Sequence, residues 1–238
     1  MTNNEQIRQF ILTNQKGFVP TKYNIGFLQT YTGCNDFNLP NDIISMTWDY
    51  LTTLYPTAES GITSANPNYV KCLHTNSGAG RFLQLAPRHL NITSFNTDMF
   101  CSFITDSVCD DRAYRNLYRG YVRDIADYFV INYNGNNEKY DIVITQPFTS
   151  KQDKSPEDEI TYNEIDFNTD YANLPPLKYY PKRGVNFLYE GGVICVVVGG
   201  RNGAVVKRAL QEDAEVELIK EIKSRDKNSY GVLIYKKL

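Results

Sequence analysis

The sequence predicts an α/β fold with a mostly parallel sheet, and three features of the chain support this prediction. From Tyr69 onward, strand-like and helix-like segments alternate, which is the pattern of a sheet covered by helices. Residues 193–198 (VICVVV) form a continuous apolar and mostly β-branched run, which is typical of a strand buried on both faces. The last two strand-like segments are separated only by residues 223–228, which predicts a terminal hairpin with an antiparallel strand at or near the sheet edge.

The composition is that of an ordinary soluble globular chain. The 238 residues suit one domain, or one domain with an N-terminal extension. Hydrophobic residues make up 42% and charged residues 22%, and the formal net charge of -2 gives no indication of a nucleic-acid partner. The N-terminus contains no apolar core of the signal-peptide type, and no apolar run approaches membrane-spanning length. We therefore expect a cytoplasmic or otherwise intracellular protein, in a cell or a virus-infected host, with no membrane partner.

The cysteines give no sign of a disulfide framework or of a metal site. They show no C-x-x-C spacing, and they are Cys34, Cys72, Cys101, Cys109 and Cys195. Three of them fall inside apolar runs, so we expect free buried thiols in a reducing compartment rather than disulfides or metal ligands. The two histidines, His74 and His89, do not cluster with cysteines, so the sequence predicts no metal.

The N-terminal part of the chain predicts two helices with irregular structure between them. Asn3–Thr13 has its apolar residues on one helical face. Residues 17–38 are rich in Gly, Thr, Asn and Tyr and predict irregular structure. A second helix begins after Pro40, because proline and an acidic residue mark its first turn, and it extends to about Leu54. Residues 57–68 predict a polar loop.

Beyond residue 69 the expected strands and helices follow in turn. The expected strands cover residues 69–74, 91–96, 121–124, 139–144, 193–198, 216–222 and 229–236. The expected helices cover residues 81–85, 98–109, 179–189 and 202–212. Residues 150–170 predict a polar, acidic and mobile loop, and residues 190–192 predict a turn.

A glycine pair lies between the first of these strands and the first of these helices. Residues 69–83 read YVKCLHTNSGAGRFL, with Gly78 and Gly80 just before the helix that begins near Arg81. Glycines at this spacing let the backbone turn sharply and approach a ligand closely. The turn would also direct free backbone N–H groups toward whatever lies above the strand end. Alternatively, the two glycines serve only the turn, and the spacing alone does not decide between the two.

Six short motifs follow one another along the chain. They are Phe37-Asn38-Leu39-Pro40, His74-Thr75-Asn76-Ser77-Gly78-Ala79-Gly80-Arg81-Phe82-Leu83, Ser94-Phe95-Asn96-Thr97-Asp98, Ala126-Asp127-Tyr128-Phe129, residues 140–148 (YDIVITQPF) and residues 188–198 (LYEGGVICVVV). Their order resembles that of the class I S-adenosylmethionine-dependent methyltransferases. The corresponding motifs there are F-x-T-P, D-P-x-x-G-x-G-x-F-L, G-x-E-x-D, G-D-F-L, F-D-V-V-x-x-N-P-P-F and L-x-x-G-G. Within the family, the chain looks most like the N6-adenine DNA methyltransferases with an N-P-P-Y or N-P-P-F motif.

This resemblance covers the chain from about Phe37 to the C-terminus and implies a specific architecture. It implies a Rossmann-like methyltransferase fold, with a mostly parallel seven-stranded sheet, an antiparallel C-terminal strand and helices on both faces. The implied cofactor is S-adenosylmethionine. We expect residues 1–66 to form a helical or irregular N-terminal extension packed on the cofactor side, and residues 67–238 to form the methyltransferase-like domain.

The resemblance also implies site residues. Asn96 stands where the family has the acid that holds the ribose hydroxyls, and Asp127 stands where an aspartate meets the adenine amino group. The implied catalytic residues, which would hold the target, are Thr145, Gln146, Pro147 and Phe148. The implied cofactor-binding residues are Phe37, Pro40, His74, Asn76, Gly78, Gly80, Asn96 and Asp127.

The chain departs from the family pattern at four places. His74 stands in place of Asp, Leu39 in place of Thr, and Asn96 in place of the ribose acid. Thr145-Gln146-Pro147 replaces Asn-Pro-Pro, whose asparagine and following carbonyl orient the weakly nucleophilic adenine amine for methyl transfer. Thr145 offers only a shorter hydroxyl, Gln146 could supply an amide oxygen, and Phe148 could stack on a base taken out of the helix. Loss of one positioned group typically lowers the rate by about 10²–10³-fold.

Each of these residues also has a purely structural interpretation. Pro147 and Phe148 could simply end a strand. Asn96 could be a turn residue at a strand end, and Asp127 a solvated acid at a helix start. A histidine inside an apolar run, such as His74, is more often a hydrogen-bonded buried residue than a ligand or a base.

The sequence therefore leaves three functions open. The first is an active enzyme that methylates adenine N6 in DNA, with RNA or a protein amide less favoured. The second is a catalytically degenerate methyltransferase fold that acts as a binding or structural subunit, such as the inactive half of a heterodimer or a viral accessory protein. The four departures favour this second function. The third is an unrelated nucleotide-binding α/β protein.

The signals for target recognition are weak. A modest basic cluster among tyrosines could contact phosphates and stack on bases, and it comprises Arg112, Arg115, Arg119 and Arg123. A solvated helix face explains the same residues equally well. The acidic residues 157–170 would repel a nucleic acid if they lay over the same site. We expect DNA rather than RNA if a nucleic acid binds, and a partner subunit could supply recognition.

Overall fold

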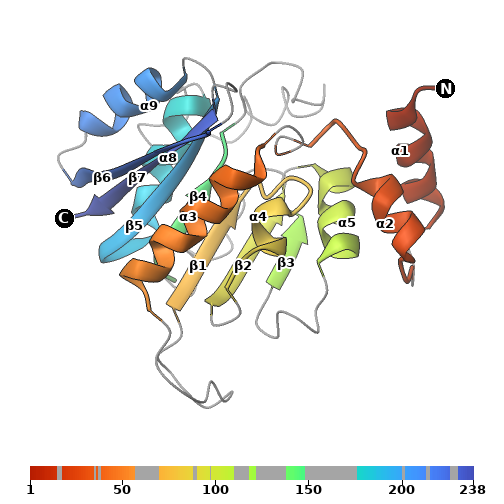
Figure 1. Cartoon of the computed structure of the whole chain (residues 1–238), viewed down its shortest axis with the longest axis horizontal. Helices are drawn as coiled ribbons and strands as arrows, with labels where there is room; N and C mark the ends of the chain where they lie inside the picture. The colour runs from red at the N-terminus through yellow and green to blue at the C-terminus, as the bar shows by residue number, and fades with distance from the viewer. Residues whose placement is uncertain are drawn as a thin grey trace, which may run out of the picture.

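A seven-stranded sheet forms the centre of the protein, in the order β3-β2-β1-β4-β5-β7-β6 (Figure 1). The computed structural model describes residues 1–14, 18–34, 36, 39–56, 70–87, 90–96, 98–109, 118–121, 138–147, 176–199, 202–212, 215–225 and 230–238. The strands are β1 (Val70–Thr75), β2 (Leu90–Asn96), β3 (Tyr118–Tyr121), β4 (Tyr140–Thr145), β5 (Leu188–Gly199), β6 (Val216–Lys223) and β7 (Tyr230–Lys237). The pairs β1–β2, β2–β3, β1–β4 and β4–β5 are parallel, whereas β7 runs antiparallel to β5 and β6. The predicted α/β fold and its terminal hairpin are therefore confirmed.

Helices cover both faces of this sheet, as the sequence predicts (Figure 1). They are α1 (Asn3–Thr13), α2 (Lys22–Leu28), α3 (Asn41–Leu54), α4 (Arg81–Gln84), α5 (Met99–Val108), α8 (Pro176–Asn186) and α9 (Asn202–Gln211). The helices α3 and α4 pack on one face, and α8 and α9 pack on the other. None of the helices in the described part of the chain combines the length and the apolar character that crossing a membrane requires.

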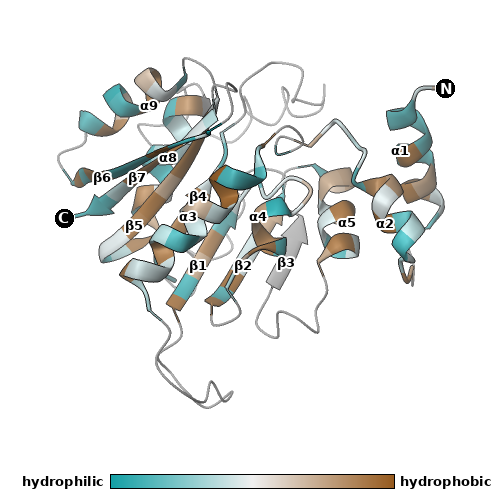
Figure 2. Ribbon diagram, viewed as in Figure 1, coloured by the Kyte–Doolittle hydropathy of each residue, from teal (hydrophilic) through white to brown (hydrophobic). Residues whose placement is uncertain are grey.

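Two apolar cores lie on the two faces of the sheet. Successive side chains of a strand point to opposite faces, so Cys72 enters the core under α3 and α4, and Leu73 enters the core under α8 and α9. In the core under α3 and α4, the indole N–H of Trp48 donates to the carbonyl of Phe82, with 2.9 Å between nitrogen and oxygen, and so links α3 to α4. The central strand β5 is hydrophobic over most of its length (Figure 2), as its burial on both faces requires.

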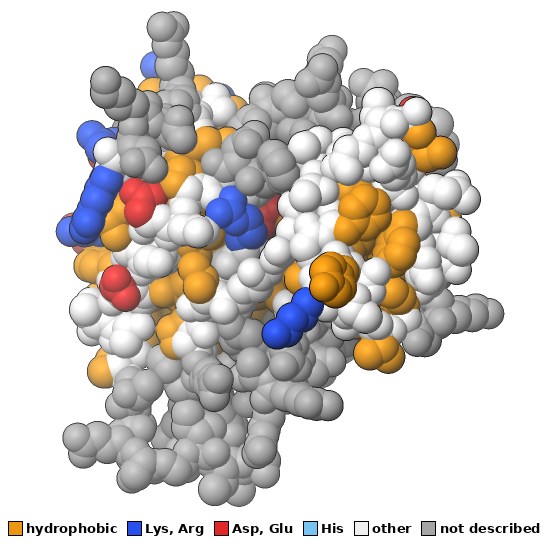
Figure 3. Space-filling view, turned by 45° about the vertical axis from the view of Figure 1, so that its right-hand side comes forward, with side chains coloured by type: hydrophobic (Ala, Val, Ile, Leu, Met, Phe, Trp, Pro, Cys, Tyr) orange, Lys and Arg blue, Asp and Glu red, His pale blue; other side chains and the backbone are white. Residues whose placement is uncertain are grey.

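A third core joins the N-terminal helices to the sheet domain. It contains residues from α1, α2 and α5 together with Cys34 and with Ala79, which lies between the two glycines of the glycine pair. Apolar side chains also gather on the outer surface of this region (Figure 3). Val19, just before α2, and Tyr23, within α2, are 83% and 91% exposed. In contrast, α3 packs on the sheet itself, although its residues fall within the expected N-terminal extension. Residues 57–69 lie outside the described part, so the expected division at residue 66 stays a prediction.

The N-terminal helices show where local signals succeeded and where they failed. The predicted helix Asn3–Thr13 is confirmed, and Thr2 and Glu5 cap it reciprocally. The prediction of irregular structure for residues 17–38 is wrong over α2. Thr21 and Asn24 form the same kind of reciprocal cap there, so the short helix begins in spite of its weak helix formers.

Two further predictions need correction in the sheet. The strand expected at 121–124 begins earlier, at Tyr118, because the residues paired with β2 are Tyr118–Tyr121, and residues 122–124 lie outside the described part of the chain. Residues 190–192, expected as a turn after a helix, lie within β5. The pairing with β4 shifts there, from Tyr140 opposite Leu188 to Ile142 opposite Val193, and Gly191 has a φ of 78°. The glycines therefore form an irregularity in a strand that starts earlier than expected.

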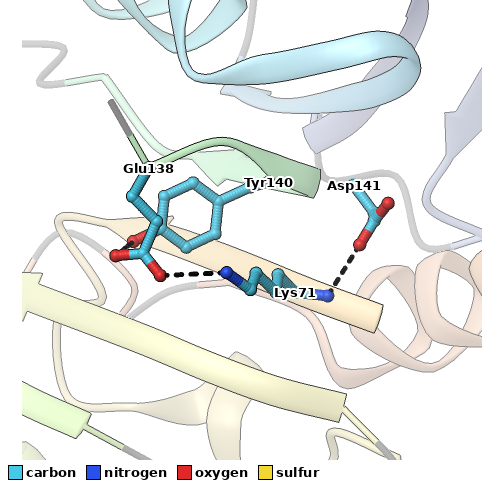
Figure 4. Close-up of polar contacts among 4 residues, drawn as sticks. All are labelled: Lys71, Glu138, Tyr140 and Asp141. Atoms are coloured by element: carbon cyan, nitrogen blue, oxygen red, sulfur yellow. Dashed lines mark hydrogen bonds and ion pairs between the residues drawn. The ribbon is translucent and has the colours of Figure 1, made fainter. Parts of the chain in front are cut away.

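Charged and polar side chains fix the amino-terminal ends of β1 and β4 (Figure 4). The Asp141 carboxylate accepts the backbone N–H of Lys71 at 2.8 Å, and the Lys71 ammonium lies 3.3 Å from the Glu138 carboxylate. The Tyr140 hydroxyl donates to the other Glu138 oxygen at 3.2 Å. The glycine pair lies at the opposite edge of the sheet, where it follows the carboxyl-terminal end of β1.

The cysteines divide into two kinds. Cys72, Cys109 and Cys195 are free and buried, as expected. Cys34 and Cys101 instead form a disulfide across 67 residues of sequence, so the prediction of a free thiol is wrong for both. Packing of the N-terminal segment against α5 brings them together in the third core, and no sequence spacing signals that contact.

Candidate functional site

The loop that follows β1, residues 76–80, is the most unusual stretch of backbone in the described structure. Asn76, Gly78 and Gly80 have φ values of 53°, 60° and 79°, which are left-handed conformations. A side chain at Gly80 would also place its Cβ 3.0 Å from the Cys109 sulfur and 3.2 Å from a Thr105 methyl carbon. The backbone angles therefore explain both glycines, and close packing is a second reason for a glycine at position 80.

Backbone N–H groups from this loop are bonded within the protein. The expectation that they point freely toward a ligand is therefore wrong for residues 77–81. The bonds run from Ser77 N to Phe95 O (3.2 Å), Gly78 N to Asn96 Oδ1 (2.8 Å), Ala79 N to Asp36 Oδ1 (2.7 Å), Gly80 N to Ser77 O (2.9 Å) and Arg81 N to Asp36 Oδ2 (3.1 Å).

Asp36 is a site residue that the sequence interpretation missed. Its carboxylate is 1% exposed and accepts the N–H groups of Ala79 and Arg81, one on each oxygen. The Arg81 guanidinium donates in return to the Asp36 carbonyl at 3.1 Å and to the Asn41 side chain at 2.6 Å. Burial raises the pKa of the Asp36 carboxyl to about 6, and the two N–H groups oppose that rise. The signal that could have identified it is its position directly before the segment 37–40.

Asn96, at the end of β2, holds the same loop from the other side. Its amide oxygen accepts from Gly78 N, and its NH₂ group donates to Gly78 O at 3.2 Å and to Thr105 Oγ1 at 3.2 Å. The Thr105 hydroxyl donates to Gly78 O at 2.7 Å. The Asn96 side chain thus uses one acceptor and both donors on its surroundings, a set that a carboxylate could not supply.

His74 lies in the core beneath α4. It is 1% exposed, and neither ring nitrogen has a hydrogen-bond partner among the described residues. Its ring packs edge to face on Phe82, with 5.5 Å between ring centres. Burial lowers the pKa of His74 to about 3, so the ring is neutral near pH 7. The buried Ser94 hydroxyl, on the neighbouring strand in register with His74, also lacks a partner within the described part.

The residues expected to hold the target lie at the end of β4. Thr145 is fully buried, and the Thr75 hydroxyl donates to its Oγ1 at 2.8 Å. Strand alternation places Thr145 on the same face as Val143, which belongs to the core under α8 and α9. Gln146 is buried and is the first residue beyond the strand, followed by Pro147.

The structure thus brings most of the predicted site residues to one edge of the sheet. His74, Asn76, Gly78, Gly80 and Asn96 lie at the ends of β1 and β2, Thr145, Gln146 and Pro147 lie at the end of β4, and Pro40 is the N-cap of α3. Phe37, Asp127 and Phe148 lie outside the described residues, as do Arg112, Arg115 and Arg123. No group of metal-ligating side chains occurs within the described residues.

Comparison with solved structures identifies this fold. A protein of Listeria monocytogenes assigned to the class I S-adenosylmethionine-dependent methyltransferases matches 98% of this chain and 68% of its own, with a TM-score of 0.57 and 15% identity. TrmN from Thermus thermophilus matches 89% of this chain and 52% of its own, with a TM-score of 0.52 and 13% identity. No protein-family model and no curated protein sequence matches the chain. The chain therefore has the Rossmann-like methyltransferase fold.

Proposed function

We propose that this protein binds S-adenosylmethionine at the loop of residues 76–80 and has descended from, or still acts as, a methyltransferase. The observation that carries the proposal is the shape of this loop. It holds three left-handed residues at the end of β1, at the carboxyl-terminal edge of a sheet whose fold matches that of methyltransferase structures. Ligands of open α/β sheets bind at that edge.

The side chains around the loop fit such a cofactor in part. Gly78 allows a ligand to approach the backbone closely, whereas the side of Gly80 that lacks a Cβ faces Cys109 and Thr105, so Gly80 contributes through the shape of the loop. Ser77 contributes a buried hydroxyl that has no hydrogen-bond partner among the described residues, so a polar group of the ligand could bond to it. Asn76 and Pro40 flank the same edge, and Phe37, His74 and Asp127 remain proposed contacts by resemblance.

Asn96 fits a different role from the one its position suggests. Its donors are already used on Gly78 and Thr105. We therefore propose that Asn96 positions the cofactor loop rather than holding the ribose.

The finer proposal concerns the methyl acceptor, which by resemblance is the N6 amine of adenine in DNA. S-adenosylmethionine supplies an electrophilic methyl group when it is bound. The chain must orient the acceptor amine, and the Thr145 hydroxyl is poorly suited to this because it is buried and bonded to Thr75. Gln146, the first residue beyond the strand, is also buried, but its longer side chain ends in an amide oxygen, so it is the better candidate to accept a hydrogen bond from the amine.

A second function is favoured by the same residues. Asn96 and Thr145 both use their polar atoms on hydrogen bonds inside the protein, at two positions where the resemblance implies contact with ligand or target. A methyltransferase fold retained as a binding or structural subunit, with a partner protein that supplies target recognition, would have these properties.

Calorimetric titration with S-adenosylmethionine and S-adenosylhomocysteine tests cofactor binding first. We expect dissociation constants in the micromolar range for wild type. Gly78→Ala should weaken binding by about tenfold or more, because an L-residue strains the loop at that position. An absence of binding at millimolar ligand would contradict the proposal and would favour the non-catalytic function.

Transfer of a labelled methyl group to adenine-containing DNA tests the finer proposal. In an active protein, Gln146→Ala should lower the rate by about 10²–10³-fold. The double variant Thr75→Val/Thr145→Val is the matched control, because it replaces both hydroxyl partners by apolar groups of similar shape and should leave the rate nearly unchanged. Loss of activity in the control, with Gln146→Ala unaffected, would assign the orienting role to Thr145 instead.

A further inference from the structure

The glycine loop depends on a carboxylate that is distant in sequence. Ala79 and Arg81 both donate their backbone N–H groups to Asp36, which lies 43 and 45 residues upstream. Because each carboxylate oxygen takes one N–H group, a shift of Asp36 would leave both amides without their acceptor. The position of Asp36 therefore sets the backbone of the loop between Gly78 and the start of α4.

A disulfide lies two residues from Asp36 in the sequence. Cys34 is bonded to Cys101 of α5, with 5.8 Å between their Cα atoms. Both cysteines are buried in the third core, and the side chain of Ala79 packs in that same core. The segment with Cys34 and Asp36 is thus held covalently to α5 on one side and by hydrogen bonds to the glycine loop on the other.

The helix α5 also holds the loop directly. Thr105 donates to the Gly78 carbonyl and accepts from Asn96, and Cys109 packs against the position of Gly80. The disulfide therefore links the two supports of one loop, α5 with its Thr105 and the N-terminal segment with its Asp36.

We propose that Cys34 and Asp36 form a redox-dependent clamp on the glycine loop, in which Asp36 is the positioning residue and the disulfide keeps it in place. Reduction by a dithiol breaks the bond between the two sulfurs. The dithiol gives up two electrons and two protons, so that Cys34 and Cys101 become thiols and the dithiol becomes a disulfide. The freed segment can then move away from α5, the Ala79 and Arg81 amides lose their acceptor, and the loop loses its ligand-binding shape. The identity of the ligand rests on the proposed function, whereas the clamp does not.

Hydrogen exchange of the ligand-free protein tests the clamp itself. In a peptide that covers residues 76–83, reduction by dithiothreitol should speed exchange of the loop amides by about tenfold or more, because hydrogen bonds to a buried charged group are lost. Asp36→Asn should do the same without reductant, and so should Cys34→Ser. Counting thiols in the unfolded protein should give three before reduction and five after it, in agreement with one disulfide and three free cysteines.

The matched control is Asp141→Asn. Asp141 also accepts a backbone N–H through its carboxylate, but it does so at Lys71, at the other end of β1 (Figure 4). This variant should leave exchange of residues 76–83 unchanged. The double variant Cys34→Ser/Cys101→Ser should exchange rapidly with or without reductant.

Titration with S-adenosylhomocysteine then shows whether the clamp matters for the ligand. We expect oxidised wild type to bind S-adenosylhomocysteine at least about tenfold more tightly than reduced wild type, Cys34→Ser or Asp36→Asn does. Unchanged loop exchange in all of these samples, or five free thiols in the unreduced protein, would overturn the clamp even if the ligand binds. Faster exchange with no ligand binding would support the clamp and would contradict the proposed function. If Asp36→Asn does not fold, reduced wild type and Cys34→Ser give the same comparison.

Discussion

At the scale of single residues, Asn96 shows how the choice between an amide and an acid determines what a side chain can support. Its NH₂ group donates to Gly78 O and Thr105, and its oxygen accepts from Gly78 N. An aspartate at this position would have no donor to offer, and its charge would lie against the Gly78 carbonyl in a buried place. The asparagine is therefore explained by the loop, without any ligand.

We expect Asn96→Asp to lower the free energy of unfolding by about 2–3 kcal/mol, because a buried charge replaces two hydrogen bonds. Urea denaturation near pH 7.5 measures this change. Asn91→Asp, at the partly exposed start of the same strand, is the matched control and should cost less than ~0.5 kcal/mol. Equal stability of Asn96→Asp and wild type, together with tighter cofactor binding, would show that position 96 faces the ligand after all.

His74 determines a second residue-level prediction, on the pH dependence of stability. The folded protein keeps this ring neutral, since burial lowers the pKa of His74 to about 3, whereas an unfolded chain takes up a proton near pH 6.5. As the pH falls below that value, the unfolded state gains protons that the folded state does not bind, so stability decreases. Between pH 7.5 and 5.0 the loss from this one group should be about 2 kcal/mol.

His74→Leu should remove that part of the pH dependence. The variant should also be no less stable than wild type at pH 5.0, because it replaces a ring without hydrogen-bond partners in the described structure by an apolar side chain. Urea denaturation of both proteins at pH 7.5 and 5.0 gives the comparison. The same loss on acidification in both proteins would show that His74 is hydrogen-bonded or hydrated in the folded state.

At the scale of elements, the glycine loop combines unusual backbone angles with close packing. Gly80 has both features, since its φ is 79° and a Cβ would lie 3.0 Å from the Cys109 sulfur. Gly26, in contrast, lies in α2, and a Cβ there would meet nothing within 4 Å. The two glycines therefore differ in whether the fold requires them.

We expect Gly80→Ala to destabilise the protein by about 1–3 kcal/mol, through backbone strain and the contact with Cys109. Gly26→Ala should instead stabilise it by about 0.5–1 kcal/mol, because alanine favours a helix and restricts the unfolded chain. Thermal unfolding of the two variants and of wild type measures whether each substitution raises or lowers stability. A stabilising Gly80→Ala would mean that the loop can adopt an ordinary backbone conformation.

The elements also show which sequence signals were sufficient. The helices α1 and α3 and the strands β4 and β7 lie where periodicity and end signals predicted them, because those signals act over a few residues. The helix α2 was missed because its reciprocal cap of Thr21 and Asn24 stands in a stretch whose composition favours loops. The start of β5 was missed because Gly191 and Gly192 indicate a turn in sequence but an irregular strand in the sheet.

At the scale of the whole molecule, the centre of the sheet is buried on both faces, whereas the edge strand β6 is largely exposed. Ile194 of β5 is fully buried, whereas Leu218 of β6 is 37% exposed. The strand β5 contributes side chains to the cores on both faces of the sheet, so we expect much of the stability of the protein to depend on this strand.

Ile194→Ala should lower the free energy of unfolding by about 2–5 kcal/mol, the usual cost of a cavity in a packed core. Leu218→Ala should cost ~1 kcal/mol or less, because its side chain already contacts solvent. Urea denaturation measures both. Comparable losses at the two positions would indicate that β6 is covered by another surface in solution.

The sequence by itself determined the α/β class, the terminal hairpin and the position of the glycine loop, because alternation, apolar runs and glycine spacing are local properties. Only the tertiary structure decided what the candidate residues contact. Asp36 reaches Ala79 across 43 residues, and Thr75 reaches Thr145 across 70. No local pattern encodes such contacts, since they depend on how strands register and which face of the sheet a side chain enters.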